Sequence, residues 1–351
     1  MFDGPLRVAV IDDSALYRQM ILNVLGRIAG VEVVGTAADG DAAVELVARV
    51  QPDVITLDVQ MPGRDGIEVL RELRQRRLAP LAIMISSLTA EGAPATVAAL
   101  MEGAFDVILK PIGVDPHVSR ELIHQELSEK LAAVRESLGA DQAAAVAVPP
   151  PWKTALRPSS GTRFDCVVIG ASTGGPQALR AVIPQLPAEL PAAVMVVQHI
   201  PPQFTSSLAA RLDSGARLRV VEAAEGMTVE KGRVLLAPGG MHLAVSRRDE
   251  HVVCVLDDGP RRHGCRPSLD HLLESAAALY GSRVLAIVLT GMGCDGVEGC
   301  RAVREQGGRV IAQAAEGCVV FGMPKAVITA GLADEVVPLE QVAATVIGHL
   351  R

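Results

Sequence analysis

Short apolar runs alternate with segments of helical spacing along most of the chain, and this alternation is what most limits the folds open to it. Before about Leu138, β-branched runs alternate with segments whose apolar residues recur every three or four positions. Parallel strands joined by helical crossovers give this pattern. The sequence therefore predicts an α/β unit of the (βα)₅ type with a parallel sheet. The expected strands are 6–11, 31–37, 53–58, 81–87 and 106–110, and the expected helices are 14–28, 40–50, 66–73, 94–103 and one starting near 115 or 116.

Residues 139–163 interrupt the alternation. This stretch is rich in Ala, Pro and Ser and has no period, which is typical of a linker that is partly extended through its proline run. A chain of 351 residues also favours two domains, because single cores seldom grow beyond about 250–300 residues. We expect an N-terminal domain at 1–138, a linker at 139–163 and a C-terminal domain at 164–351.

The alternation returns after Cys166 and predicts a second α/β unit, a doubly wound sheet. Hairpin-like strands, forming a small antiparallel region, are expected around residues 232–256. The two halves share a class but no evident sequence repeat. The expected strands are 166–170, 192–198, 218–222, 233–237, 242–246, 251–256, 284–289 and 308–313, and the expected helices are 176–185, 203–214, 269–279, 296–306, 324–330 and one from 339 to the end.

Composition excludes several functional classes. A net charge of −7 gives no electrostatic case for binding nucleic acid. No apolar stretch reaches the roughly 18 residues of a membrane span, and the first residues lack the pattern of a signal peptide, so we expect a cytoplasmic protein without direct membrane insertion. The six cysteines have no CxxC spacing, and inert thiols are the default expectation rather than a zinc site or a disulfide framework.

Acidic residues gather at the expected carboxyl edge of the first sheet, where open α/β folds bind ligands. Asp12 and Asp13 end the first strand and Asp58 ends the third, while Ser86 and Lys110 end the fourth and fifth. Carboxylates this close repel one another unless a cation lies between them, and Mg²⁺ suits such a site. A carboxylate beside Mg²⁺ can accept a phosphoryl group, whose charge Lys110 would neutralise and to which Ser86 would donate. The alternative, that these acids are merely solvated, fits a single aspartate better than this set.

The segments VIDDS, TLDVQMPGRDGIEVL, MISSLT and VILKP resemble the response-regulator receiver family across residues 5–130. The resemblance implies that Asp58 is phosphorylated by a histidine kinase. It also implies that Asp13, Asp58 and the Gln60 carbonyl hold Mg²⁺, with Asp12 assisting. Receivers often carry an aromatic residue three positions before the lysine, and here that position is Val107, which excludes an aromatic rotamer switch there.

A second candidate site begins at a glycine-rich turn. Residues 170–174, GASTG, match G-x-S-x-G, which places Ser172 on a sharp turn between a strand and a helix N-terminus. The helix dipole favours an anion there, and the next backbone N–H can bind an oxyanion. The turn lacks the GK[ST] of a P-loop and the spacing of a dinucleotide fingerprint. A plain glycine-rich turn remains the alternative to a nucleophile.

Two other strand ends supply partners for this serine. His199 follows the neighbouring strand, and Asp295 lies in a glycine-rich turn after a later one. A base and an orienting carboxylate complete a catalytic triad, which is recognised by roles rather than by chain order. The order Ser, His, Asp differs from that of the α/β-hydrolases. His242 and His263 are weaker candidates for the base, and Cys294 is a weaker candidate for the nucleophile because no adjacent base is evident.

The segments GASTGGPQAL, VVQHIPPQFTSSLAARL, APGGMHL, RPSLD, LTGMGCDG and CVVFGMPKAV resemble the chemotaxis-type protein-glutamate methylesterase family. The resemblance implies Ser172 as nucleophile, His199 as general base and Asp295 as its orienter. It also implies that Thr173 supports the elbow and that the Met292 backbone N–H binds the oxyanion. The chain departs from the family pattern at 314–316, where an acid expected after Gln313 is displaced, and at 294, where a small or amide residue is more usual.

The resemblance implies phosphorylation-controlled hydrolysis of glutamyl methyl esters on methyl-accepting chemoreceptors, giving glutamate and methanol, with glutamine deamidation as a second activity of some relatives. The ester chemistry needs no cofactor, and Mg²⁺ belongs to phosphorylation of the receiver. The other hypotheses are a receiver-controlled binding module and an esterase of another signalling pathway. The sequence leaves open which receptors and glutamates are substrates.

Overall fold

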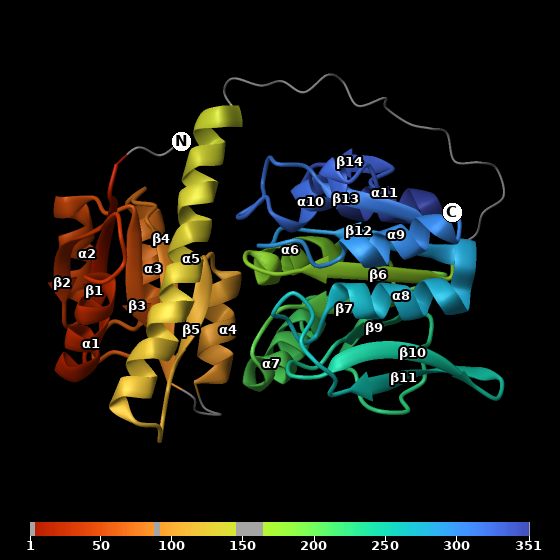
Figure 1. Ribbon diagram of the computed structural model, residues 1–351, viewed down its shortest axis with the longest axis horizontal. Helices are drawn as coiled ribbons and strands as arrows, with labels where there is room; N and C mark the ends of the chain where they lie inside the picture. Colours follow the sequence, from red (N-terminus) through yellow and green to blue (C-terminus); the bar gives the residue numbers. More distant parts are fainter. Residues whose placement is uncertain (1–3, 88–91, 145–163, 351) are drawn as a thin grey trace. The chain divides into compact units, whose positions relative to one another are not determined.

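The alternation of strands and helices is present in both halves of the chain in the computed structural model (Figure 1). The structure describes residues 4–87, 92–144 and 164–350. The chain divides into two units, Met1–Val148 and Pro149–Arg351, each with its own sheet. Among the described residues, no helix combines the length and apolar character needed to cross a membrane.

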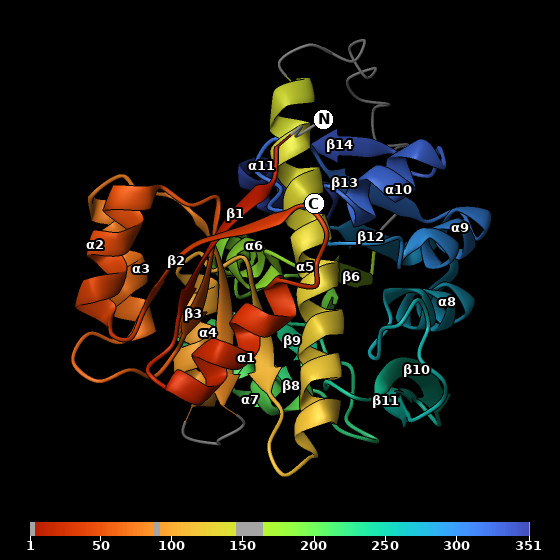
Figure 2. The ribbon, with the colours of Figure 1, turned by 60° about the vertical axis from the view of Figure 1, so that its left-hand side comes forward.

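The N-terminal unit is the predicted (βα)₅ fold. Its strands are all parallel, in the order β2-β1-β3-β4-β5. Helices α1 and α5 pack together on one face, and α2, α3 and α4 cover the other (Figure 2). The elements are β1 Leu6–Ile11, α1 Ala15–Leu25, β2 Val31–Ala37, α2 Gly40–Val50, β3 Val54–Asp58, α3 Gly66–Gln75, β4 Leu81–Ser87, α4 Ala93–Met101, β5 Asp106–Lys110 and α5 Pro116–Ala144.

Polar caps fix where several of these helices begin. The side chains of Ser14 and Asp39 accept hydrogen bonds from backbone N–H groups in the first turns of α1 and α2, and Asp65 forms a capping box with Glu68 on α3. Helix α5 differs from expectation at its other end, because it continues to Ala144, beyond the predicted start of the linker at residue 139. The alanines of this stretch are strong helix formers. The rest of the predicted linker, 145–163, lies outside the described residues.

The C-terminal unit is a doubly wound sheet of parallel strands in the order β14-β13-β12-β6-β7-β9-β8. Helices α6, α7 and α11 pack in one group and α8, α9 and α10 in another. The elements are β6 Cys166–Ala171, α6 Gly175–Val182, β7 Ala193–Gln198, α7 Pro202–Asp213, β8 Arg219–Glu222, β9 Arg233–Leu236, β10 His242–Arg248, β11 His251–Asp257, α8 Leu269–Tyr280, β12 Val284–Val288, α9 Val297–Glu305, β13 Arg309–Gln313, α10 Met323–Thr329, β14 Glu335–Val337 and α11 Leu339–Leu350.

The predicted small antiparallel region is confirmed, but it begins at His242 rather than near residue 232. Strands β10 and β11 pair antiparallel and form a separate two-stranded ribbon that packs on α8. Strand β9, which begins the predicted hairpin region, instead pairs parallel with β7 and β8 in the main sheet. The bounds were wrong because β9 is short and its last three residues are apolar, a pattern that suits any buried strand. The short strand β14 was not predicted.

Because each unit has its own sheet and core, we expect residues 164–351 to fold when expressed alone and to show the esterase activity that the sequence resemblance implies. A cooperative thermal transition of this fragment, together with methanol release at least equal to that of the unphosphorylated full chain, checks the expectation. An insoluble or inactive fragment would contradict it.

Candidate functional site

The three acids predicted at the first sheet edge lie together. Carboxylate oxygens of Asp12, Asp13 and Asp58 are all within 4.8 Å of one another. Asp12 and Asp58 are buried, whereas Asp13 is exposed. Lys110 Nζ lies 2.6 Å from Asp58 Oδ2 and 2.8 Å from Asp12 Oδ2, so this ammonium is the counter-charge of the buried pair.

The electrostatics of this pocket fit a divalent cation. Burial raises the pKa of Asp58 above its ordinary value, although Lys110 opposes the shift, and the nearby Asp12 raises it further. Asp12 Oδ2 is buried and, despite the adjacent ammonium, accepts no hydrogen bond of good geometry. The negative charge of these three carboxylates exceeds the single positive charge of Lys110, and the Asp13 carboxylate is exposed. Clustered carboxylate oxygens of this kind suit Mg²⁺.

The other residues predicted for this first site have different hydrogen-bond partners. The Gln60 backbone N–H donates to Asp58 Oδ1 at 3.3 Å, which places this stretch of main chain against the carboxylate. Ser86 is buried, and its hydroxyl lies 2.7 Å from Thr96 Oγ1 on α4 rather than bonding to Asp58. The Ser86 hydroxyl is thus engaged by Thr96, and binding a phosphoryl oxygen as predicted would require it to leave this partner. Sequence reasoning missed Thr96 because it lies inside a helix, away from any strand end.

The serine elbow has the predicted strand, turn and helix. Ser172 directly follows β6, its backbone N–H donates to Thr290 O at 3.0 Å, and its carbonyl accepts from Gly175 N at 2.7 Å. Gly174 has a φ of 78°, and a Cβ there would lie 2.5 Å from Val319, so the turn requires glycine. The Gln198 amide donates to the carbonyls of both Ser172 and His199. Gln198, which sequence reasoning did not single out, thus ties the elbow to the end of β7.

His199 and Asp295 are in direct contact. His199 Nε2 lies 2.8 Å from Asp295 Oδ2, and both side chains are largely buried. Burial alone would raise the pKa of Asp295, but the interaction with His199 and further hydrogen bonds hold it below its ordinary value. A buried carboxylate beside Nε2 fixes the proton on that nitrogen and stabilises imidazolium. Ser172 Oγ makes no hydrogen bond to His199 in the described structure.

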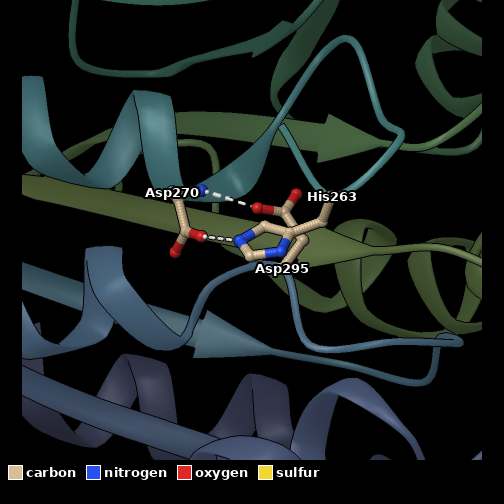
Figure 3. Close-up of side chains that lie close together, drawn as sticks. All are labelled: His263, Asp270 and Asp295. Atoms are coloured by element: carbon tan, nitrogen blue, oxygen red, sulfur yellow. Dashed lines mark hydrogen bonds and ion pairs between the residues drawn. The ribbon is translucent and has the colours of Figure 1, made fainter. Parts of the chain in front are cut away.

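Asp295 is held by the N-terminus of α8. Its Oδ1 accepts from Ser268 Oγ at 2.7 Å. The same oxygen accepts from the Asp270 N–H at 3.1 Å (Figure 3). Its Oδ2 accepts from the Leu269 N–H at 2.6 Å. A helix N-terminus stabilises negative charge through its free N–H groups and its dipole. The family-like segment RPSLD contained these residues, but the sequence alone assigned them no role.

The weaker candidates are engaged elsewhere. His263 Nε2 lies 3.1 Å from Asp270 Oδ2, so this histidine pairs with Asp270 rather than with Asp295 (Figure 3). His242 is buried, and its ring nitrogens bond the backbone at Pro260 and Ser268. Contrary to expectation, Cys294 Sγ does have an imidazole nearby, 3.7 Å from His263 Nδ1. Burial nevertheless raises the pKa of the Cys294 thiol, which disfavours the nucleophilic thiolate.

The proposed oxyanion donor is close to the elbow. A Cβ added to Gly291 would lie 2.7 Å from Ser172 Cβ, so the 291–293 turn runs against the serine. The side chain of Met292 is exposed, and within the described part of the chain its N–H has no protein acceptor. Thr173 is buried and its carbonyl accepts from Thr290 Oγ1, which anchors the elbow to the end of β12.

Comparison with known proteins matches this chain to a family. A profile described as CheB methylesterase matches residues 167–346, and one described as response regulator receiver domain matches residues 8–121. This chain belongs to the CheB methylesterase family. It is 43% identical to the protein-glutamate methylesterase/protein-glutamine glutaminase of Symbiobacterium thermophilum, over 97% of this chain and 95% of the relative.

Other relatives agree. The protein of the same description from Thermotoga maritima is 43% identical and covers 96% of each chain. The crystal structure of the Thermotoga maritima CheB methylesterase catalytic domain is 47% identical with a TM-score of 0.52, and the match covers 53% of this chain and 98% of that one. Membership of the CheB methylesterase family thus rests on the whole chain, whereas the likeness of structure concerns the catalytic half.

Proposed function

We propose that this chain hydrolyses γ-glutamyl methyl esters on chemoreceptor proteins to glutamate and methanol, and that phosphorylation of its receiver controls the rate. The observation that carries the chemistry is the His199–Asp295 pair, held at 2.8 Å beside a serine elbow. The description of the relatives also supports hydrolysis of receptor glutamine side chains at the same site.

Each proton transfer in this proposal involves a particular atom. Because Asp295 occupies Nε2 of His199, Nδ1 is the nitrogen that takes the Ser172 proton as Oγ attacks the ester carbonyl. The Met292 N–H stabilises the resulting oxyanion. Collapse expels the methoxide oxygen, which takes the proton from Nδ1 and departs as methanol, leaving an acyl-serine. Water then repeats the sequence and frees the glutamate carboxylate. An amide substrate follows the same path, but its leaving group is ammonia. Release of ammonia depends more strongly on protonation of the leaving nitrogen.

The receiver accepts its phosphoryl group on Asp58 from a histidine kinase. Carboxylates of Asp12, Asp13 and Asp58 and the Gln60 carbonyl would hold Mg²⁺, which when bound offsets the charge of the phosphoryl oxygens. Lys110 adds a positive charge and Ser86 a hydroxyl donor. These partners place the protein in the cytoplasm, where both the kinase and the methylated receptor segments are accessible.

Methanol release from methylated receptor membranes tests the proposal. We expect methanol to appear with the wild-type protein. A binding module would release none, and an esterase of another pathway would hydrolyse simple methyl esters while leaving methylated receptors intact.

A further inference from the structure

The second ring nitrogen of His199 already has a partner. Nε2 is taken by Asp295, and Nδ1 lies 3.5 Å from Cys265 Sγ, within the range of a hydrogen bond to sulfur. Cys265 lies on the loop between β11 and α8, four residues before the helix N-terminus that holds Asp295, and its side chain is half-buried. The thiol therefore meets the nitrogen that must accept the Ser172 proton.

The other ionisable groups near His199 are directed at one another. Asp270 pairs with His263, whose other ring nitrogen faces Cys294. Arg262 forms two hydrogen bonds with Glu274. Within the described residues, Asp295 and Cys265 are thus the ionisable side chains that contact the imidazole, one at each nitrogen.

We propose that Cys265 is a positioning residue of the esterase, whose sulfur accepts from Nδ1–H of the protonated imidazole and holds His199 in a resting state. The inference rests on the proposed function, because that function makes Nδ1 the atom that accepts the Ser172 proton. Ser172 must displace the thiol from Nδ1 before it can transfer its proton. Cys265 thus competes with the nucleophile for the base.

Charge and hydrogen bonding agree with this arrangement. Burial would lower the pKa of His199, but the hydrogen bonds to Asp295 and Cys265 outweigh it and raise the pKa to about 10. A base with a raised pKa is protonated at neutral pH and becomes active only as the pH rises. The acid limb of the rate profile should therefore lie well above the ordinary histidine value of about 6.5.

Removing the sulfur should shift this limb toward lower pH. In Cys265→Ala, we expect the limb of kcat/KM to move down by about one pH unit, because a hydrogen bond to a charged group is lost. The rate at neutral pH should then rise about tenfold, while the plateau at high pH changes much less. Cys265→Ser keeps a hydrogen-bond acceptor at this position, so its limb should stay closer to that of the wild type than the limb of Cys265→Ala. Cys294→Ala is the matched control: it removes a thiol that faces His263, and the limb should stay in place.

A titration of the His199 ring nitrogens by NMR in the full chain tests the same point without relying on esterase activity. The His199 signal is assigned by its loss in His199→Gln. We expect its midpoint to fall in Cys265→Ala, to fall less in Cys265→Ser and to remain at the wild-type value in Cys294→Ala. An unchanged or higher midpoint in Cys265→Ala overturns the inference. Failure to release methanol while the midpoint shifts as expected would instead count against the proposed function alone.

Discussion

Replacing Ser172 by alanine is expected to lower the rate of methanol release by at least about 1,000-fold, because the bond-forming oxygen is removed and only binding and oxyanion stabilisation remain. The fold should be unaffected. Ser172 Oγ makes no hydrogen bond in the described structure, and the backbone contacts of the elbow to Thr290, Gly175 and Gln198 do not depend on it. We expect the free energy of unfolding to change by less than about 1 kcal/mol.

The exposed Ser206 on α7 provides a matched control, because Ser206→Ala makes the same chemical change away from the elbow. Its rate and its thermal midpoint should both equal those of the wild type. Near-normal methanol release from pure Ser172→Ala would rule out this serine as the nucleophile.

Asp295→Asn should lower the rate by roughly 10⁴-fold, the loss found when a triad aspartate is replaced by asparagine. Four donors converge on this carboxylate, from His199, Ser268, Leu269 and Asp270. The NH₂ of an asparagine must replace one acceptor oxygen. At the Oδ2 position it faces the Leu269 N–H and drives the His199 proton onto Nδ1, which removes the base. At the Oδ1 position it faces the Asp270 N–H.

The control for this variant is His263→Gln, which alters the neighbouring histidine that pairs with Asp270 instead. We expect its rate to stay within about tenfold of the wild type. A large loss in His263→Gln together with a small loss in Asp295→Asn would transfer the role of base from His199 to His263.

Sequence patterns located the site because carboxyl ends of parallel strands converge. Ser172, His199 and Asp295 follow β6, β7 and β12, which are adjacent in the sheet order, so strand assignment alone brings them to one edge. Asp12 and Asp58 converge in the same way at the ends of β1 and β3. Residues of this kind can be found without knowing any tertiary contact.

Residues that act across elements could not be found in this way. Ser268 supports Asp295 only because α8 starts beside the 295 turn, and no periodicity in the sequence encodes that placement. Thr96 meets Ser86 only because α4 packs against β4. Cys265 was expected to be an inert thiol. The sequence does not show that its loop lies against His199 at the end of β7, because that placement is set by the fold.

Phosphorylation of the receiver is expected to control the esterase domain. Phosphorylation of Asp58 would add about −1.5 to −2 of charge beside Lys110 and close to β4, which carries Ser86. We propose that phosphorylation raises the esterase rate, and that recruitment of Ser86 away from Thr96 alters the receiver face formed by α4 and β5. A complete shift from an almost fully inactive to an almost fully active population would need about 5.5 kcal/mol of differential stabilisation. We therefore expect partial activation.

The most direct test compares methanol release from methylated receptors with and without a small phosphodonor and Mg²⁺, in wild type and in Asp58→Asn. The account predicts that the donor accelerates the wild type and leaves the variant at its basal rate. Equal acceleration of both proteins, or no acceleration of a wild type whose Asp58 is shown to be phosphorylated, would contradict it.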